Sequence, residues 1–117
     1  MKNYIKHFPK EPSFKQNGFD GYTSELECKN LSITFEDVYK GHEKYAMNTE
    51  SYSIYYVTEG RGTFKIAEDL YDVEKGDIVE IPPKTQFVFN GEMKLLLIMN
   101  PPFDAENDVA GKINDIY

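Results

Sequence analysis

The sequence has few of the residues on which several protein classes depend. Its 117 residues include one cysteine (Cys28), one arginine (Arg61), two histidines and no tryptophan. A single cysteine excludes an internal disulfide framework and a zinc site built from several cysteines. The 13 basic residues form no lysine-rich block and are outnumbered by 20 acidic ones, which gives a net charge of −7. Because nucleic-acid binding requires clustered positive charge, we expect no DNA or RNA partner.

Long hydrophobic runs are also missing. The longest, residues 95–99, is far too short to span a bilayer, and residues 1–7 contain no apolar stretch that could serve as a secretory signal. The length suits one domain with one core. We therefore expect an acidic, cytoplasmic, single-domain protein with no membrane partner.

What is abundant points to β-structure. Aromatic residues make up 15% of the chain, as nine tyrosines and eight phenylalanines, and eight glycines and six prolines separate the short apolar segments. This composition favours strands joined by turns. We expect an N-terminal arm over residues 1–30 with one possible strand that forms a dimer, a barrel over 31–103, and a solvated acidic tail over 104–117.

Within the barrel region, residues 31–35 alternate apolar and polar side chains, which is typical of a half-buried strand. Glu59-Gly60-Arg61-Gly62 is predicted to be a turn, and Asn90-Gly91 is predicted to close a hairpin. Seven or eight short strands favour a closed barrel or sandwich, since closure removes exposed edges. An open antiparallel sheet is the alternative.

Two glycine-spaced segments resemble the conserved motifs of the cupin superfamily. The first motif, G-x5-H-x-H-x3,4-E-x6-G, resembles the segment from Gly41 to Gly60. The second, G-x5-P-x-G-x2-H-x3-N, resembles the segment that begins at Gly76 and contains Pro82. The resemblance covers about residues 41–100 and implies an all-β double-stranded β-helix, the cupin or jelly-roll barrel, and a homodimer.

The motif positions that hold a divalent metal in that superfamily have lost their ligands. The two histidines and the glutamate of the first motif are matched by Met47, Thr49 and Ser53, and the histidine of the second by Phe87. Thioether, hydroxyl and phenyl groups do not replace imidazole and carboxylate as metal ligands. We therefore expect neither a metal nor another cofactor.

The resemblance also implies which side chains face the barrel interior, because strand side chains alternate. His42 is expected near the barrel mouth. The expected pocket lining combines apolar walls with a few polar groups, as small-molecule sites do. Its inward members are Glu43, Tyr45, Met47, Thr49, Ser53, Tyr55, Thr85, Phe87 and Phe89.

Two of these residues are candidate catalytic groups. A desolvated Glu43 would serve as a general base, and Tyr55 as an acid or hydrogen-bond donor. Each has a structural alternative: Glu43 as a solvated residue at the barrel mouth, Tyr55 as packing, and Met47, Phe87 and Phe89 as barrel filling.

The expected function is a metal-independent cupin that binds a small polar metabolite, a sugar or sugar derivative, and acts as an isomerase, epimerase or lyase. A non-catalytic ligand-binding or regulatory module is the first alternative. A metal enzyme with unusual ligands is the second. Phe103, after the two prolines at 101 and 102, either caps one opening of the barrel or belongs to a surface turn.

Overall fold

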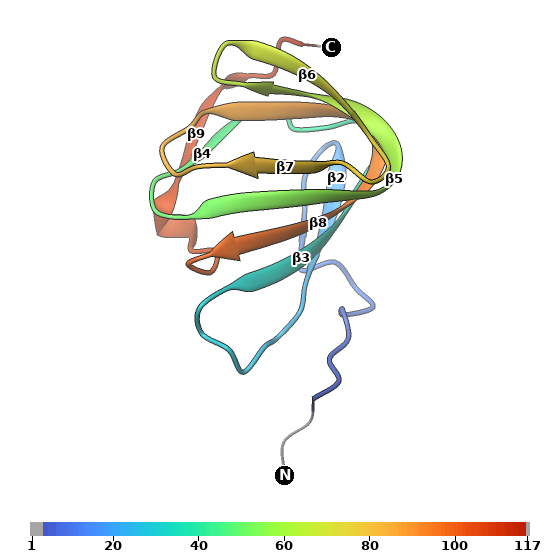
Figure 1. The fold of residues 1–117 in the computed structure, drawn as a ribbon, viewed down its shortest axis with the longest axis vertical. Coiled ribbons are helices and arrows are strands. Elements are labelled where there is room, and N and C mark those ends of the chain that lie inside the picture. The colour runs from blue at the N-terminus through green and yellow to red at the C-terminus, as the bar shows by residue number, and fades with distance from the viewer. Residues whose placement is uncertain (1–3, 117) are drawn as a thin grey trace.

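The computed structural model describes residues 4–116. The chain is almost entirely β-structure, with one short 3₁₀ turn, η1 (Ala105–Asn107), before the last strand (Figure 1). The strands are β1 (Phe14–Lys15), β2 (Phe19–Thr23), β3 (Ser32–Val38), β4 (Lys44–Asn48), β5 (Tyr52–Ile66), β6 (Asp69–Glu74), β7 (Ile78–Ile81), β8 (Phe87–Asn100) and β9 (Asp108–Ile113). The all-β prediction is confirmed.

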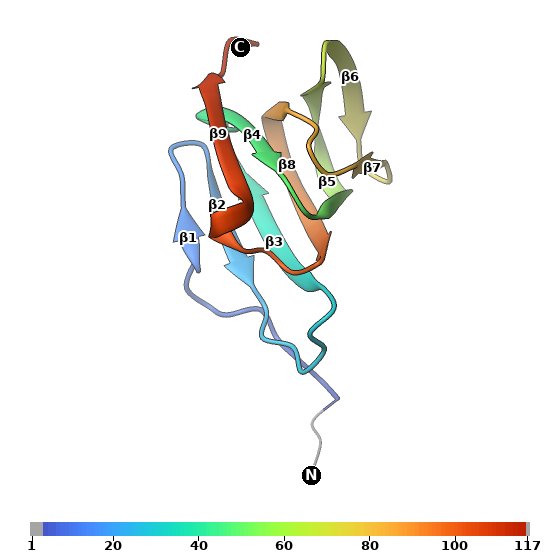
Figure 2. The same ribbon diagram turned by 90° about the vertical axis from the view of Figure 1, so that its left-hand side faces the viewer.

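All strand pairs are antiparallel, and the two long strands, β5 and β8, organise the sheet. Six strands lie in the order β1-β2-β3-β8-β4-β9, and β5 pairs with β8 along its length and with β6 and β7 on its other edge. The sheet curls around a common interior, with β1 and β2 at one side and β6 and β7 at the other (Figure 2). This arrangement is the curled barrel, not the open sheet.

The two turns predicted from glycine are wrong, because both lie inside continuous strands. Gly62 of β5 pairs directly with Gly91 of β8, and Gly91 has a φ of 144°. A Cβ atom on Gly62 would lie 2.3 Å from the backbone oxygen of Asn90. The glycines let the paired strands approach closely and bend together, which carries both from one side of the barrel to the other.

Strand β3 turns its polar residues inward. Thr34 and Glu36 are buried, whereas Ile33 and Phe35 lie on the outer face. The half-buried strand is therefore present, but its apolar side faces away from the barrel interior. The reason lies in the register: Glu36 pairs with Leu95, whose side chain is fully buried in the core.

The outer face of β3, β8, β5 and β7 carries two adjacent apolar rows. One row runs from Ile33 through Ile98 to Ile54, and the next from Phe35 through Leu96 and Tyr56 to Ile78. Antiparallel sheets that expose one face to water usually present polar residues there. Two apolar faces on one sheet are typical of a sheet covered on both sides.

Both terminal segments contain more structure than the sequence indicated. The arm contributes β1 and β2, and the tail contributes β9, which pairs with β4. Within residues 4–116, no helix has the length and apolar character needed to cross a membrane. The core of the barrel comprises Phe19, Val38, Tyr55, Val57, Phe64, Val73, Val79, Ile81, Phe87, Phe89, Met93, Leu95, Leu97 and Met99.

Candidate ligand-binding site

A cavity of about 550 Å³ lies inside the barrel, within the usual range for small-molecule sites. Its floor is the inner face of β3, β8 and β5, its roof is β4 with the start of β9, and β1 and β2 form one side. It is lined by Ser13, Phe14, Lys15, Gln16, Phe19, Thr23, Thr34, Glu36, His42, Ala46, Met47, Asn48, Ser53, Tyr55, Phe87, Leu97, Met99, Phe103 and Asp108.

The floor holds a buried carboxyl group and a buried phenol. Thr34, Leu97 and Tyr55 form one cross-strand row, and Glu36 lies at the next inward position of β3. Burial raises the pKa of Glu36 to about 8. Burial also raises the pKa of Tyr55 well above 10, with a further contribution from the Glu36 charge. Both groups therefore carry their protons at neutral pH and present O–H donors.

The Glu36 carboxyl is not satisfied by the protein. Its Oε1 atom is buried and has no hydrogen-bond partner among the described residues. A buried polar atom without a partner costs free energy, so its retention calls for an explanation. A polar ligand in the cavity supplies one.

His42 is held between aromatic rings on the cavity wall. Its ring centroid lies 3.8 Å from that of Phe89, 5.4 Å from Phe19 and 5.5 Å from Phe87. Burial lowers the pKa of His42 to about 3, so the imidazole is neutral at physiological pH. The backbone N–H of His42 also donates to the carbonyl of Phe89 at 2.9 Å.

A second carboxylate enters the cavity from the other side. Asp108, the first residue of β9, accepts a hydrogen bond of 2.8 Å from the Asn48 side chain. Partial burial raises the pKa of Asp108, while the Asn48 bond acts in the opposite direction. The cavity therefore combines a buried, proton-bearing carboxyl on β3 with a less buried carboxyl on β9 that is hydrogen-bonded to Asn48.

The cavity rim is aromatic, with one cation. Phe14 and Phe103 are both partly exposed, and both line the cavity, as does Lys15. The Phe14 ring lies directly over Gly21, where a Cβ atom would meet it at 2.1 Å. Phe103 was expected either to cap an opening of the barrel or to belong to a surface turn. Its position on the cavity lining agrees with the first interpretation.

Five of the predicted pocket residues line this cavity: His42, Met47, Ser53, Tyr55 and Phe87. Another, Phe89, is fully buried behind the imidazole of His42. Thr85 is partly buried outside the cavity, and its hydroxyl donates to the carbonyl of Pro83.

The remaining predicted residues lie on β4 or next to it, where Ala46, Met47 and Asn48 reach the cavity. Glu43 is exposed and lines an adjoining hollow of about 310 Å³ together with Tyr45. The Tyr45 hydroxyl donates to Asp115. Thr49 lies outside both spaces, and its backbone N–H donates to the carbonyl of Asn107.

Neither Glu36 nor Asp108 is among the residues predicted from the sequence. The only signal for Glu36 is its place two residues after Thr34 in a run predicted to be a half-buried strand, whose apolar side would ordinarily face the interior. Asp108 lay in a tail predicted to be solvated, and its approach to Asn48 depends on the pairing of β9 with β4.

The residues at the motif positions for a metal do not fit one. Met47, Ser53 and Phe87 present a thioether, a hydroxyl and a phenyl ring to the cavity. Among residues 4–116, no three histidine, cysteine, aspartate or glutamate side chains are grouped so that they could hold a metal ion. We therefore derive no chemical step through a metal.

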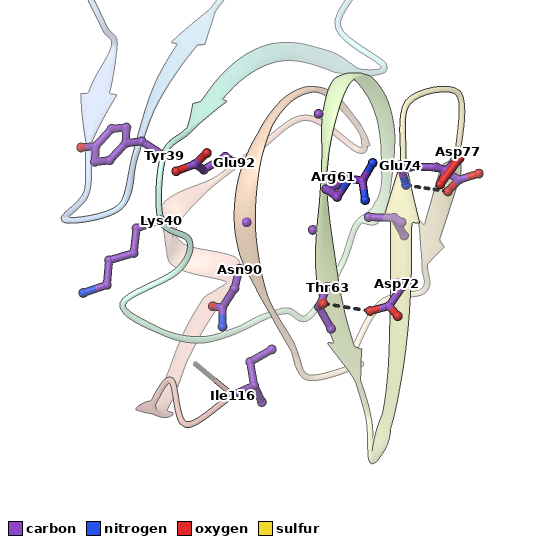
Figure 3. A pocket seen from close by; sticks show the side chains of 14 residues that line it. Tyr39, Lys40, Arg61, Thr63, Asp72, Glu74, Asp77, Asn90, Glu92 and Ile116 are labelled. Atoms are coloured by element: carbon purple, nitrogen blue, oxygen red, sulfur yellow. Dashed lines mark hydrogen bonds between the residues drawn. The ribbon is translucent and has the colours of Figure 1, made fainter.

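A larger open groove of about 1190 Å³ lies elsewhere on the barrel (Figure 3). Its charged side chains, Arg61, Glu74 and Asp77 among them, are partly or fully exposed, and Asp77 accepts a hydrogen bond of 2.7 Å from the backbone N–H of Glu74. Three buried titratable groups, Glu36, His42 and Tyr55, line the smaller cavity and none of them lines the groove, so we assign the candidate site to the cavity.

Comparison with known proteins agrees with this architecture. Residues 35–89 match the model of the AraC-like ligand binding domain. An uncharacterized protein of Methanocaldococcus jannaschii is 38% identical over 61 residues, which cover 49% of this chain and 49% of that protein, so the match spans about half of this relative.

Among solved structures, Pac13 from Streptomyces, a nucleoside dehydratase, superimposes with a TM-score of 0.89 at 21% identity, covering 97% of this chain and 95% of its own. Variants of Pac13 in which a tyrosine is replaced by phenylalanine, or a histidine by glutamine, were solved with uridine. KdgF from Halomonas has a TM-score of 0.71 at 14% identity and covers 85% of this chain and 96% of its own.

At these identities the structural likenesses establish the fold. Together with the curled antiparallel barrel and the match over residues 35–89, they show that the chain has the cupin, or jelly-roll, fold.

Proposed function

We propose that this cupin binds a nucleoside or a related sugar derivative in the barrel cavity and removes water from it without a metal. The observation that carries the proposal is the set of groups around the cavity. Glu36, Tyr55, Asp108 and the neutral imidazole of His42 face one space whose other walls are largely apolar or aromatic. Such a site offers both proton donors and an acceptor to one small ligand.

Removal of water breaks a C–H bond and a C–O bond and forms a C=C bond, so it needs a base and an acid. The Asp108 carboxylate takes the proton from carbon, and its neighbour Asn48 holds it in place. The Glu36 carboxyl group protonates the departing oxygen, which leaves as water. A pKa of about 8 suits that role, since an acid works best when its pKa is near the working pH.

The substrate must itself make the C–H bond acidic. We propose a sugar or nucleoside that carries an aldehyde or ketone next to that carbon, with the departing hydroxyl one carbon further along. Negative charge then develops on the carbonyl oxygen, to which the Tyr55 O–H and an N–H of the His42 imidazole would donate hydrogen bonds. The aromatic rim at Phe14 and Phe103 offers faces on which a planar base can stack.

The likeness to Pac13 supports this choice of ligand. Pac13 is a nucleoside dehydratase whose variants were solved with uridine, and the positions replaced there carried tyrosine and histidine, residue types that also line this cavity. The loss of metal ligands supports the metal-independent form of the proposal.

The test is turnover of a panel of oxidised sugars and nucleosides, followed by mass spectrometry for the loss of one water. Glu36→Gln and Asp108→Asn should each reduce turnover at least 100-fold, while Glu43→Gln, which alters an exposed carboxylate outside the cavity, should stay within twofold of wild type. A chelator should leave turnover unchanged. Loss of activity in Glu43→Gln with activity retained in Asp108→Asn would overturn the assignment.

A second candidate function is ligand binding without turnover. It is favoured by the match to the AraC-like ligand binding domain. Saturable binding of uridine with no loss of water from any oxidised sugar or nucleoside would select it over the dehydratase.

We also propose that the protein forms a homodimer through the outer face of β3, β8, β5 and β7. The first row is apolar from Ile33 to Ile54 and ends at Glu80 of β7, and the second is apolar from Phe35 to Ile78. Because each copy carries a net charge of −7, an apolar patch lets two copies associate with few like charges facing one another. The exposed, single cysteine is compatible with the reducing cytoplasm that we propose as its compartment.

A further inference from the structure

We propose that Asn114 is a positioning residue that fixes His42 in the cavity wall, so that the segment after β9 belongs to the functional site although it does not touch the cavity. This inference rests on the proposed function in one respect: a ligand bound in the cavity contacts His42. No residue from 109 to 116 lines the cavity.

Asn114 is buried, with 5% of its surface exposed, and each polar atom of its side chain is used. The Nδ2 atom donates to the backbone carbonyl of His42 at 2.9 Å and also to the Oδ1 atom of Asn90. The Oδ1 atom of Asn114 accepts from the backbone N–H of Ile116 at 3.0 Å. One amide group thus joins the C-terminal segment, the loop before β4, and β8.

The backbone of the His42 loop is tied on both sides. On one side its N–H donates to Phe89 at 2.9 Å; on the other its carbonyl receives the Asn114 bond. The backbone N–H of Asn114 also donates to the carbonyl of Glu43 at 3.0 Å. A substitution of Asn114 keeps this backbone bond and the bond to Phe89 but removes the one to the His42 carbonyl, so we expect the peptide plane after His42 to turn and the imidazole to shift relative to Glu36 and Tyr55.

Two hydrogen-bond partners of Asn114 lie on the side of the barrel away from the cavity, at the surface. Asn90 and Ile116 both line the large groove, and Figure 3 shows their side chains there. The rings of Phe19, Phe87 and Phe89 pack against the imidazole but form no directional bond to the backbone of His42. Orientation of its peptide plane therefore depends on hydrogen bonds.

The chain offers a matched control in the adjacent residue. Asp115 holds the same segment by a different contact, since it accepts from the Tyr45 hydroxyl and forms a 3.0 Å ion pair with Lys112. Asp115→Asn weakens the anchoring of the segment without removing a bond to His42. Asn114→Ala and Asn114→Asp remove the donor that His42 uses.

The experiment uses full-length protein labelled with ¹³C and ¹⁵N on histidine only. The chain has two histidines, the buried His42 and the exposed His7, so the spectrum holds one reporter and one internal reference. In the free protein, Asn114→Ala and Asn114→Asp should shift or broaden the ring signals of His42 and leave those of His7 in place. Asp115→Asn should leave both in place.

Uridine affinity is measured in parallel by calorimetry. The Asn114 variants should weaken binding about tenfold, and Asp115→Asn less than twofold. An unchanged His42 spectrum in Asn114→Ala, or equal losses of affinity in Asn114→Ala and Asp115→Asn, would overturn the inference. If wild type does not bind uridine, the proposed ligand fails, while the spectra of the free proteins still decide the role of Asn114.

Discussion

The side-chain amide of Asn48 donates a hydrogen bond of 2.8 Å to the Asp108 carboxylate and so joins β4 to β9 at the cavity wall. The Oδ1 atom of Asn48 meanwhile accepts from the backbone N–H groups of Glu50 and Ser51 at 3.0 and 2.8 Å. One residue therefore shapes the loop after β4 and holds a carboxylate of the site.

Asn48→Asp should separate these two roles. The new carboxylate keeps the acceptor for the loop but faces Asp108 with like charge, so the free energy of unfolding should fall by about 1–3 kcal/mol at pH 7. The loss should be smaller at pH 4, because protonation of either carboxylate removes the repulsion and burial raises the pKa of Asp108. Urea denaturation of wild type and variant at both pH values measures the difference, and an equal loss at both would argue against the charge contact.

Glu36 should make the protein less stable as pH rises from 4.5 to 8, and above pH 6.5 this loss is no longer opposed by His42. Between pH 6.5 and 8 the folded protein keeps the Glu36 proton, because the pKa is about 8, while the unfolded chain, with a pKa of 4.5, has lost it. Unfolding then releases a proton, and the free energy of unfolding should drop by up to about 2 kcal/mol across this range. Glu36→Gln should abolish that drop.

His42 has the opposite effect at low pH. Its pKa is lowered from 6.5 to about 3, so the unfolded chain takes up a proton that the folded protein does not, and stability falls as pH drops below 6.5. Between pH 4.5 and 6.5 the Glu36 effect opposes that of His42, so Glu36→Gln should make this acid-side loss steeper. Thermal midpoints measured from pH 3 to 9 test both the Glu36 effect and the His42 effect. If the midpoints of wild type and Glu36→Gln followed the same pH dependence, they would contradict a buried, proton-bearing Glu36.

Phe87 and Phe64 should behave differently, although both are buried. Phe87 lines the cavity and contacts the His42 ring, whereas Phe64 does not line the cavity and packs behind Tyr55 in the core. Phe64→Ala should cost about 3–5 kcal/mol of stability and leave uridine affinity within twofold once folded. Phe87→Ala should lose stability and also weaken binding at least tenfold. Unchanged uridine affinity in Phe87→Ala would place the ligand elsewhere.

The outer apolar face should control association. Ile54 and Ile98 lie side by side at its centre, so Ile54→Lys should convert the proposed dimer into a monomer, because the lysine would be buried against an apolar surface. Val109→Lys, at an exposed position of β9, should stay dimeric. Analytical ultracentrifugation distinguishes the species, and a wild-type monomer would refute the proposed dimer.

The all-β architecture could be predicted from the sequence because local strand signals and the two motif spacings agree with the global fold. The shape of the barrel could not. Gly62 and Gly91 each resemble a turn in isolation, and only their pairing across β5 and β8 makes them a joint bend. Pairing between segments about 30 residues apart is not visible in a local pattern.

The candidate site was predicted only in part, for the same reason. Ser53 and Tyr55 line the cavity because β5 keeps a regular alternation. Glu36 was missed because the apolar side of β3 faces outward, and local alternation does not tell which face of a strand is the interior. Asp108 depends on the long-range pairing of β9 with β4.

The most direct test of the account is a crystal structure of the protein grown with uridine. The account predicts electron density for the nucleoside inside the cavity, with a polar atom of the ligand within hydrogen-bond distance of the Glu36 Oε1 atom. Uridine bound in the open groove beside Arg61 and Asn90 (Figure 3), with the cavity free of it, would contradict the account.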